Sequence, residues 1–172
     1  MFTKLNKPIQ IPVYEIQQRV VGYANKIIYS TVSTPLNNIF SLVPERYKKD
    51  FVVLIMEISG SISPHTDSGI LSTINIYLKP DECKTVFYEL IDTTVPIRQI
   101  KNLTIGKLFS LPNLKVIGEF EAQPNDAWLL DVTQIHSVIA SSTSISRIAI
   151  CLQSSRHSAA HVKEMLTETG YL

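Results

Sequence analysis

A close succession of short strand-like segments, beginning at Phe51, constrains this chain more than any other feature of its sequence. The segments are five to nine residues long and are separated by turn-prone residues, as is typical of β-strands. They are FVVLIMEIS, LSTINIYL, TVFYELI, TIGKLFSL, KVIGEF, AWLLDV, HSVIA and SRIAICLQ. So many strands at close spacing predict a β-sandwich or barrel over residues 51–153.

The sequence on either side of this β core favours helices. Apolar residues recur upstream at spacings of three and four, which predicts an amphipathic helix: Val13, Ile16, Val20, Val21 and Ala24. A second short helix is expected from about residue 36 to residue 49, interrupted by Pro44. We therefore expect residues 1–50 to form a helical support region on one outer face of the β core. Residues 154–172 are expected to contain a C-terminal helix over 158–169.

Size, charge and cysteine usage limit the class of protein. A chain of 172 residues suits a single domain, and 16 Lys and Arg against 15 Asp and Glu favour neither nucleic acid nor an anionic membrane. The start lacks the apolar stretch of a secretory signal, and the longest apolar run, Phe51 to Met56, is too short to cross a bilayer. Cys83 and Cys151 have no metal-binding or redox spacing and are expected to be buried thiols. These features predict a cytoplasmic protein without nucleic-acid or membrane partners.

The segment from Leu71 to Leu78 alternates strictly between polar and apolar residues. In a strand, Thr73, Asn75 and Tyr77 share one face, and Ile74, Ile76 and Leu78 share the other. The polar face either meets water or lines an internal cavity. The strand alone leaves both alternatives open.

Three residues form a candidate metal site. His65 and Asp67 are two positions apart, so an extended chain projects both side chains from one face, and His136 opens a later strand. Two histidines and one carboxylate form the facial triad of non-haem iron(II) oxygenases, which leaves the remaining metal positions open. The alternative for His65 and Asp67 is a turn pair whose carboxylate orients a backbone amide. Asp131, five residues before His136, is a candidate for orienting a ligand through a hydrogen bond.

Arg147 follows His136 across a candidate hairpin whose turn is Ser-Ser-Thr-Ser. Antiparallel pairing within that hairpin is expected to put both side chains on the same face. Arg147 alternates with apolar residues and shares its face with Ala149 and Cys151, so we expect it to point inward. A buried guanidinium needs an anionic partner. That partner is either a ligand carboxylate or an acid of this chain.

The ordered motifs PHTD, STINIYLK, NDAWLLDVTQIHSV and SRIAICL resemble the iron(II)- and 2-oxoglutarate-dependent dioxygenases, especially their prolyl 4-hydroxylase-like branch. The resemblance covers roughly residues 51–153. It implies a mainly β, double-stranded β-helix (jelly-roll or cupin-like) fold and a single oxygenase domain over residues 1–172.

The resemblance also implies roles for individual residues. His65, Asp67 and His136 would hold Fe(II), and 2-oxoglutarate would chelate the metal through its keto and C1-carboxylate oxygens. Arg147 and Tyr77 would anchor the distal carboxylate, with Thr73 and Asn75 lining the same pocket. Dioxygen would take the last metal position, and turnover would release succinate and carbon dioxide and usually hydroxylate a substrate C–H bond.

The chain departs from the family pattern at several positions. Where members often carry Gly-Gly-Glu-Thr, only Thr85 and Phe87 of ECKTVFYE look comparable, and Ala149 stands where a serine is common. Related nucleic-acid demethylases carry a second arginine at the position of Gln153, which favours a small-molecule or peptidyl substrate here. The alternatives are a non-catalytic jelly-roll binding module and a zinc hydrolase. A hydrolase has no need for an inward Arg147.

Overall fold

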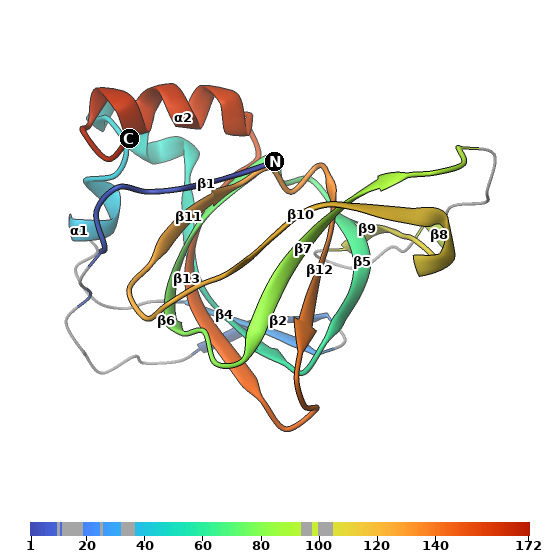
Figure 1. The fold of residues 1–172 in the computed structure, drawn as a ribbon. Helices are drawn as coiled ribbons and strands as arrows, with labels where there is room; N and C mark the ends of the chain where they lie inside the picture. Colours follow the sequence, from blue (N-terminus) through green and yellow to red (C-terminus); the bar gives the residue numbers. More distant parts are fainter. Residues whose placement is uncertain (10, 12–18, 25, 32–36, 94–97, 100–104) are drawn as a thin grey trace.

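A computed structural model describes residues 1–172 except 10, 12–18, 25, 32–36, 94–97 and 100–104. The described residues form two antiparallel sheets with few helices, which confirms a mainly β chain (Figure 1). The first sheet contains, in spatial order, β1 (Phe2–Lys4), β11 (Ala127–Leu130), β6 (Ser72–Lys79), β13 (Ser146–Ser154), β4 (Val52–Ser59), β3 (Ile27–Thr31) and β2 (Arg19–Ala24). The second contains β10 (Leu114–Glu121), β7 (Cys83–Leu90), β12 (Ile135–Ala140), β5 (Ile62–Asp67), β9 (Ile105–Leu108) and β8 (Arg98–Gln99).

The chain crosses between the two sheets as it proceeds from β4 to β7 and again from β10 to β13. Each consecutive strand in these stretches joins the opposite sheet, so strands that follow one another within a stretch do not pair with each other. β12 and β13 illustrate the consequence. They are consecutive but do not pair, because β12 lies between β7 and β5 while β13 lies between β6 and β4. The prediction that they form a hairpin is therefore wrong.

Helices cover the outer face of the first sheet (Figure 1). α2 (Ala159–Glu168) begins at Ser158, whose side chain accepts a hydrogen bond from the backbone amide of His161. This confirms the predicted C-terminal helix. Its buried side chains join α1 (Asn37–Phe40) and the outer face of the sheet in the largest hydrophobic cluster, which contains Ile39, Leu42, Ile74, Ile76, Ile150, Leu152, Val162, Met165 and Leu166.

The N-terminal region differs from its prediction. Arg19–Ala24 forms strand β2, which pairs with β3, so the helix predicted across Val13–Ala24 is wrong there; residues 12–18 lie outside the described residues. The second predicted helix is reduced to α1 and the 3₁₀ helix η1 (Glu45–Asp50), which starts after Pro44. A further short 3₁₀ helix, η2, spans Leu111–Asn113. The region upstream of the β core thus contributes strands to the first sheet as well as short helices.

Asp50, at the end of η1, connects this segment to the start of α2. Its carboxylate accepts hydrogen bonds from Arg156 Nη1 at 2.8 Å and from His157 Nε2 at 3.1 Å. His157 also packs against the rings of Tyr47 and Phe51. His157 is therefore a structural partner of Asp50.

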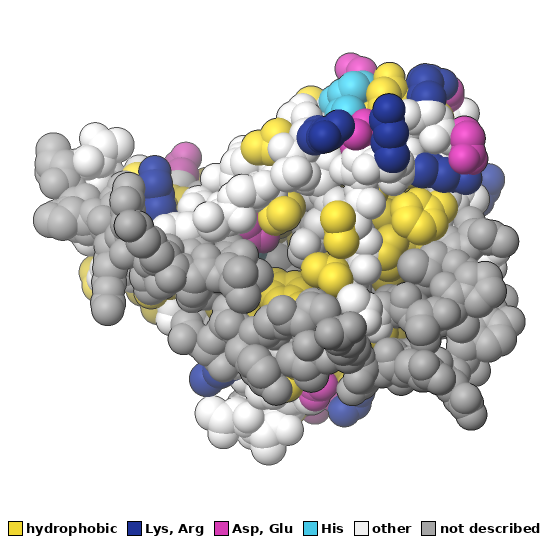
Figure 2. All heavy atoms as spheres, turned by 180° about the vertical axis from the view of Figure 1, so that it is seen from behind, with side chains coloured by type: hydrophobic (Ala, Val, Ile, Leu, Met, Phe, Trp, Pro, Cys, Tyr) yellow, Lys and Arg dark blue, Asp and Glu magenta, His cyan; other side chains and the backbone are white. Residues whose placement is uncertain are grey.

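None of the helices in the described part of the chain combines the length and apolar character that crossing a bilayer demands. Side chains of both charge signs gather over the end of the molecule that carries α2, and hydrophobic side chains reach the surface near the middle of the same view (Figure 2). This intermixing gives the α2 end no broad field of one sign.

Candidate metal centre

Strand pairing brings the three candidate ligands together. His65 on β5 lies directly opposite His136 on β12, and residues directly opposite on antiparallel strands have neighbouring side chains. Asp67 follows His65 by two positions and therefore projects from the same face of β5. The backbone amide of Asp67 donates to the carbonyl oxygen of Val132 at 3.0 Å, which fixes the end of β5 against the segment that precedes β12.

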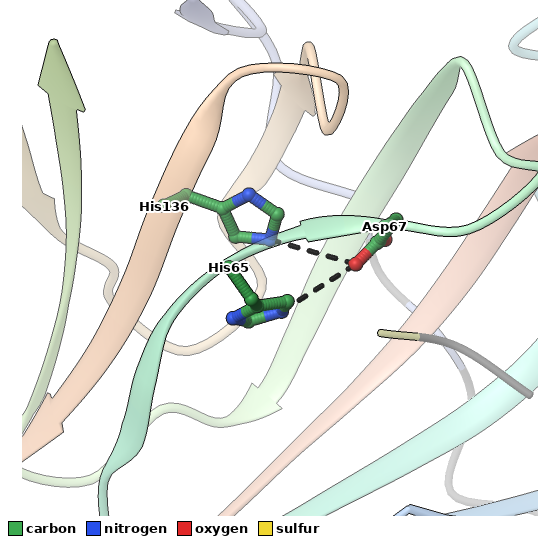
Figure 3. Close-up of side chains that lie close together, drawn as sticks. All are labelled: His65, Asp67 and His136. Carbon is green, nitrogen blue, oxygen red and sulfur yellow. Dashed lines mark ion pairs between the residues drawn. The ribbon is translucent and has the colours of Figure 1, made fainter. Parts of the chain in front are cut away.

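The three side chains converge on a common point (Figure 3). Asp67 Oδ1 lies 3.4 Å from His65 Nε2 and 3.8 Å from His136 Nε2. One possible ligand atom from each residue lies within 4.8 Å of the others. His65 and His136 are buried, while Asp67 is partly exposed. This donor set and spacing suit a divalent transition metal with open coordination positions.

Backbone carbonyls orient both imidazoles. His65 Nδ1 lies 2.8 Å from the carbonyl oxygen of Ser63, and His136 Nδ1 lies 2.9 Å from that of Gln134. A carbonyl oxygen only accepts, so each Nδ1 carries a hydrogen, and Nε2 of each ring faces Asp67. Burial, followed by the neighbouring His65, lowers the pKa of His136 to about 4, which keeps this imidazole neutral at physiological pH.

Sequence reasoning missed these carbonyls and proposed Asp131 for the orienting role. Asp131 Oδ1 instead accepts a hydrogen bond from the hydroxyl of Thr133 at 2.6 Å and so stabilises the turn before β12. A second contact that the sequence did not predict is the ring of Phe87, which stacks on His136 with centroids 5.7 Å apart. Phe87 lies opposite His136 in the sheet, but that register cannot be derived before the strand pairing is known.

Arg147 lines the same cavity from the facing sheet. Only 2% of the residue is exposed, and its Nη2 donates to Thr85 Oγ1 at 2.9 Å. Its Nε and Nη1 have no hydrogen-bond partner among the described residues, and no acid of the described chain lies within ion-pair distance. Of the two partners considered for Arg147, an acid of this chain is therefore not found in the described residues. The guanidinium presents two unsatisfied donors to the cavity.

Tyr77 supports this guanidinium. The carbon at the centre of the Arg147 guanidinium lies 4.3 Å from the centre of the Tyr77 ring, which is a cation–π contact. Tyr77 is fully buried, and its hydroxyl also lacks a hydrogen-bond partner in the described chain. Thr73 and Asn75 line the cavity on the same strand, and Thr73 Oγ1 donates to Asn75 Oδ1 at 2.8 Å. The polar face of β6 thus looks inward, while Ile74 and Ile76 pack beneath the helices.

Arg147 thus lines the same cavity as His136, although the two residues do not lie in the predicted hairpin. His136 lies on β12 in the second sheet and Arg147 lies on β13 in the first sheet. Both side chains line the cavity between the two sheets. The contact with Thr85 on β7 ties the guanidinium to the sheet that carries both histidines. The remaining cavity wall is mostly apolar and includes Ile27, Met56, Ile58, Ile62, Leu130, Val132 and Val138.

No protein-family model matches this chain, and no curated protein matches it in sequence. Similar solved structures include hazelnut (Corylus avellana) vicilin, at 10% identity and a TM-score of 0.45 over 82% of this chain and 32% of the vicilin. They also include the epimerase SnoN in complex with Fe3+, alpha-ketoglutarate and nogalamycin RO, at 12% identity and a TM-score of 0.46 over 80% of this chain and 68% of SnoN.

The Escherichia coli ribosomal oxygenase YcfD is similar at 12% identity and a TM-score of 0.42, over 74% of this chain and 31% of YcfD. The chain thus spans about a third of the length of the vicilin and of this oxygenase. At these identities and TM-scores the similarities do not assign the chain to a family.

Proposed function

We propose that this chain is an Fe(II)- and 2-oxoglutarate-dependent oxygenase that hydroxylates a small-molecule or peptidyl substrate. The observation that carries the proposal is the buried Arg147, which has unsatisfied donors and faces the cavity of the His–Asp–His cluster. Burying an unpaired guanidinium is costly, so the site is expected to bind an anion. The planar fork of arginine suits a carboxylate, which accepts two parallel hydrogen bonds from it.

The spacing of the two features fits a ligand with carboxylates at both ends. Thr85, which holds the Arg147 guanidinium, lies opposite Val138, two residues along β12 from His136. Two strand residues span about 7 Å. A small dicarboxylate can therefore contact Arg147 with one end and a metal on the cluster with the other. The free hydroxyl of Tyr77 is a further donor for the distal carboxylate.

Each protein group has a defined task in this proposal. His65, Asp67 and His136 would hold iron and leave positions open, and the carbonyls of Ser63 and Gln134 keep both imidazoles in the ligating tautomer. Bound iron with 2-oxoglutarate supplies the oxidising chemistry that uses dioxygen and releases succinate and carbon dioxide. Arg147, Thr85 and Tyr77 fix the orientation of the co-substrate, and the apolar wall excludes water from the reacting centre.

The winding of the chain supports the same proposal. Eight strands, four adjacent ones in each sheet, follow the order that a double-stranded β-helix requires: β4, β6, β11 and β13 face β5, β7, β10 and β12. We propose this finer fold class for the chain. In this fold class the candidate ligands on β5 and β12 would lie opposite Arg147 on β13, across the cavity between the sheets.

The test is oxygen-dependent turnover of 2-oxoglutarate without added substrate. Protein loaded with Fe(II) is expected to release succinate slowly when oxygen is admitted, and the Asp67→Ala variant is expected to release none. Iron that binds without any succinate release would favour the non-catalytic alternative. Hydrolytic activity with zinc that persists in an Arg147→Ala variant would favour the zinc hydrolase.

A further inference from the structure

Gln153 presents an unused amide to the cavity. It is the last inward-facing residue of β13 that lines the cavity, and it lies opposite Thr73 on β6. Its side chain makes no hydrogen bond to the described residues. An amide in this setting offers one acceptor and two donors to a ligand.

Gln153 lies on the side of the candidate metal centre away from Arg147. The segment that joins β12 to β13 lies next to Arg147 in the chain. His136 is four residues from the end of β12 that meets this segment, and Gln153 is seven residues from the corresponding end of β13. Arg147 and Gln153 are six residues apart, which corresponds to about 20 Å of strand. A ligand that spans from Arg147 to the metal would leave Gln153 free. This end of the cavity is therefore the place for a second ligand, the substrate.

The charges around the cavity restrict that second ligand. Among the lining residues that the structure describes, Arg147 and Asp67 are the only ones with a formal charge when both histidines are neutral. If the proposed function holds, the charges of a divalent metal and Arg147 balance those of Asp67 and a dianionic co-substrate. A charged group of the substrate would then be buried without a partner, at a high cost.

We propose that the cavity takes an uncharged substrate and that Gln153 determines its specificity by hydrogen bonding to an amide of that substrate. This inference rests on the proposed function, since it assigns the part of the cavity that a co-substrate on Arg147 leaves open. The amide belongs either to a peptide or to a small carboxamide. Asn75 adds a second polar contact, because its Oδ1 already accepts from Thr73 and its amide hydrogens are left for a ligand.

The experiment measures binding to protein loaded anaerobically with Fe(II) and 2-oxoglutarate, with the visible charge-transfer band as the readout. The peptide-like probes are N-acetylated amino-acid methylamides, and the small-molecule probes are aliphatic carboxamides. The matched charged probes are the free amino acids and the corresponding carboxylates. We expect one set of amides to shift the band and to bind at least tenfold more tightly than its charged counterparts, and the set that does so identifies the source of the amide.

The Gln153→Leu variant is expected to form the same band with 2-oxoglutarate but to bind the amide roughly tenfold more weakly, the effect of losing about two neutral hydrogen bonds. Gln153→Glu keeps the size of the side chain and gives a second test if the leucine variant does not fold. Gln123→Leu, at an exposed glutamine in the turn after β10, is the matched control and should bind like the parent protein.

The possible failures are distinguishable. If no band forms, the proposed function fails and this proposal with it. If the band forms but no amide binds, or charged probes bind at least as tightly, the proposal for the substrate is overturned while the oxygenase assignment stands. Unchanged amide binding by both Gln153 variants would likewise overturn it.

Discussion

At the scale of single residues, the cavity is lined by buried side chains whose polar atoms have no hydrogen-bond partner in the described chain. Arg147 has only one of its hydrogen bonds satisfied within the described chain, and Tyr77 none through its hydroxyl. A stable fold rarely buries such groups without use. We therefore expect these residues to matter more for ligand binding than for folding.

The first prediction removes the guanidinium. Arg147→Ala is expected to weaken 2-oxoglutarate binding by about 2–5 kcal/mol, the scale for truncating one partner of a buried charged pair. Isothermal titration calorimetry on iron-loaded protein under argon measures the difference. Arg156→Ala is the control, because Arg156 is 70% exposed and lies outside the cavity. Equal affinity of the Arg147 variant and the parent protein would remove Arg147 from the proposed role.

The two cysteines give a second prediction at this scale. Burial raises the pKa of Cys151 to about 12 and also raises the pKa of Cys83, and both thiols are almost fully buried. Because the thiolate is the reactive form, neither should react with a disulfide reagent at pH 8 in the folded protein. Both should react once urea unfolds the chain. Rapid labelling of either thiol before unfolding would contradict the burial described here.

At the scale of secondary-structure elements, α2 connects the C-terminal region to the outer face of the first sheet. Leu166 is fully buried in the largest hydrophobic cluster. Leu166→Ala is expected to lower the free energy of unfolding by about 2–5 kcal/mol, as measured by urea denaturation. Lys163→Ala, on the exposed side of the same helix, should change it by less than about 0.5 kcal/mol. Equal effects of the two substitutions would show that α2 is not packed as described.

Asp50 gives a pH-dependent prediction for the connection between η1 and α2. The hydrogen bond from His157, ahead of the charge of Arg156, lowers the pKa of Asp50. The unfolded chain therefore takes up a proton at a higher pH than the folded protein does. The stabilisation is present above the ordinary carboxyl pKa and is lost as the pH falls through the lowered value. Urea denaturation at several pH values should show an acid-side loss of stability that is smaller in Asp50→Asn.

How far the sequence predicts these elements depends on where their partners lie. The alternation of Thr73, Asn75 and Tyr77 with Ile74 and Ile76 is local, and the family resemblance implies that the polar face lines a pocket. The polar face of β6 does line the cavity, and Ile74 and Ile76 pack on the other side. β2 was predicted wrongly because a register irregularity between Val20 and Gly22 disturbs its alternation. An extra residue in a strand breaks the period of two that identifies it.

The wrong prediction of a hairpin between β12 and β13 has a different cause. Consecutive strands joined by a short turn usually pair, and nothing local to residues 135–154 shows that these two do not. Their true partners are more than forty residues away along the chain: β13 pairs with β4 and β6. The contacts of Arg147 with Thr85 and of His136 with Phe87 also join residues that are more than forty positions apart in the sequence. The sequence therefore indicates which residue types belong to the site but not which of them contact each other.

At the scale of the whole molecule, two sheets face each other and helices cover the outer face of one of them (Figure 1). Residues from both sheets line a cavity between them. The sheet of β5 and β12 carries the candidate ligands, and the sheet of β6 and β13 carries Arg147, Tyr77 and Gln153. The central claim is that these two sets of side chains form one binding site. Neither set accounts for the proposed chemistry by itself.

The most direct test of this claim is an anaerobic titration of the metal-free protein with Fe(II) and then with 2-oxoglutarate, followed by visible absorption. We predict a charge-transfer band that appears only when both are present and that saturates at equimolar iron. The band should be lost in Asp67→Ala, and Arg147→Ala should need much more 2-oxoglutarate to reach it. The claim is contradicted if iron binds Asp67→Ala as tightly as the parent protein, or if iron-loaded parent protein shows no band at saturating 2-oxoglutarate.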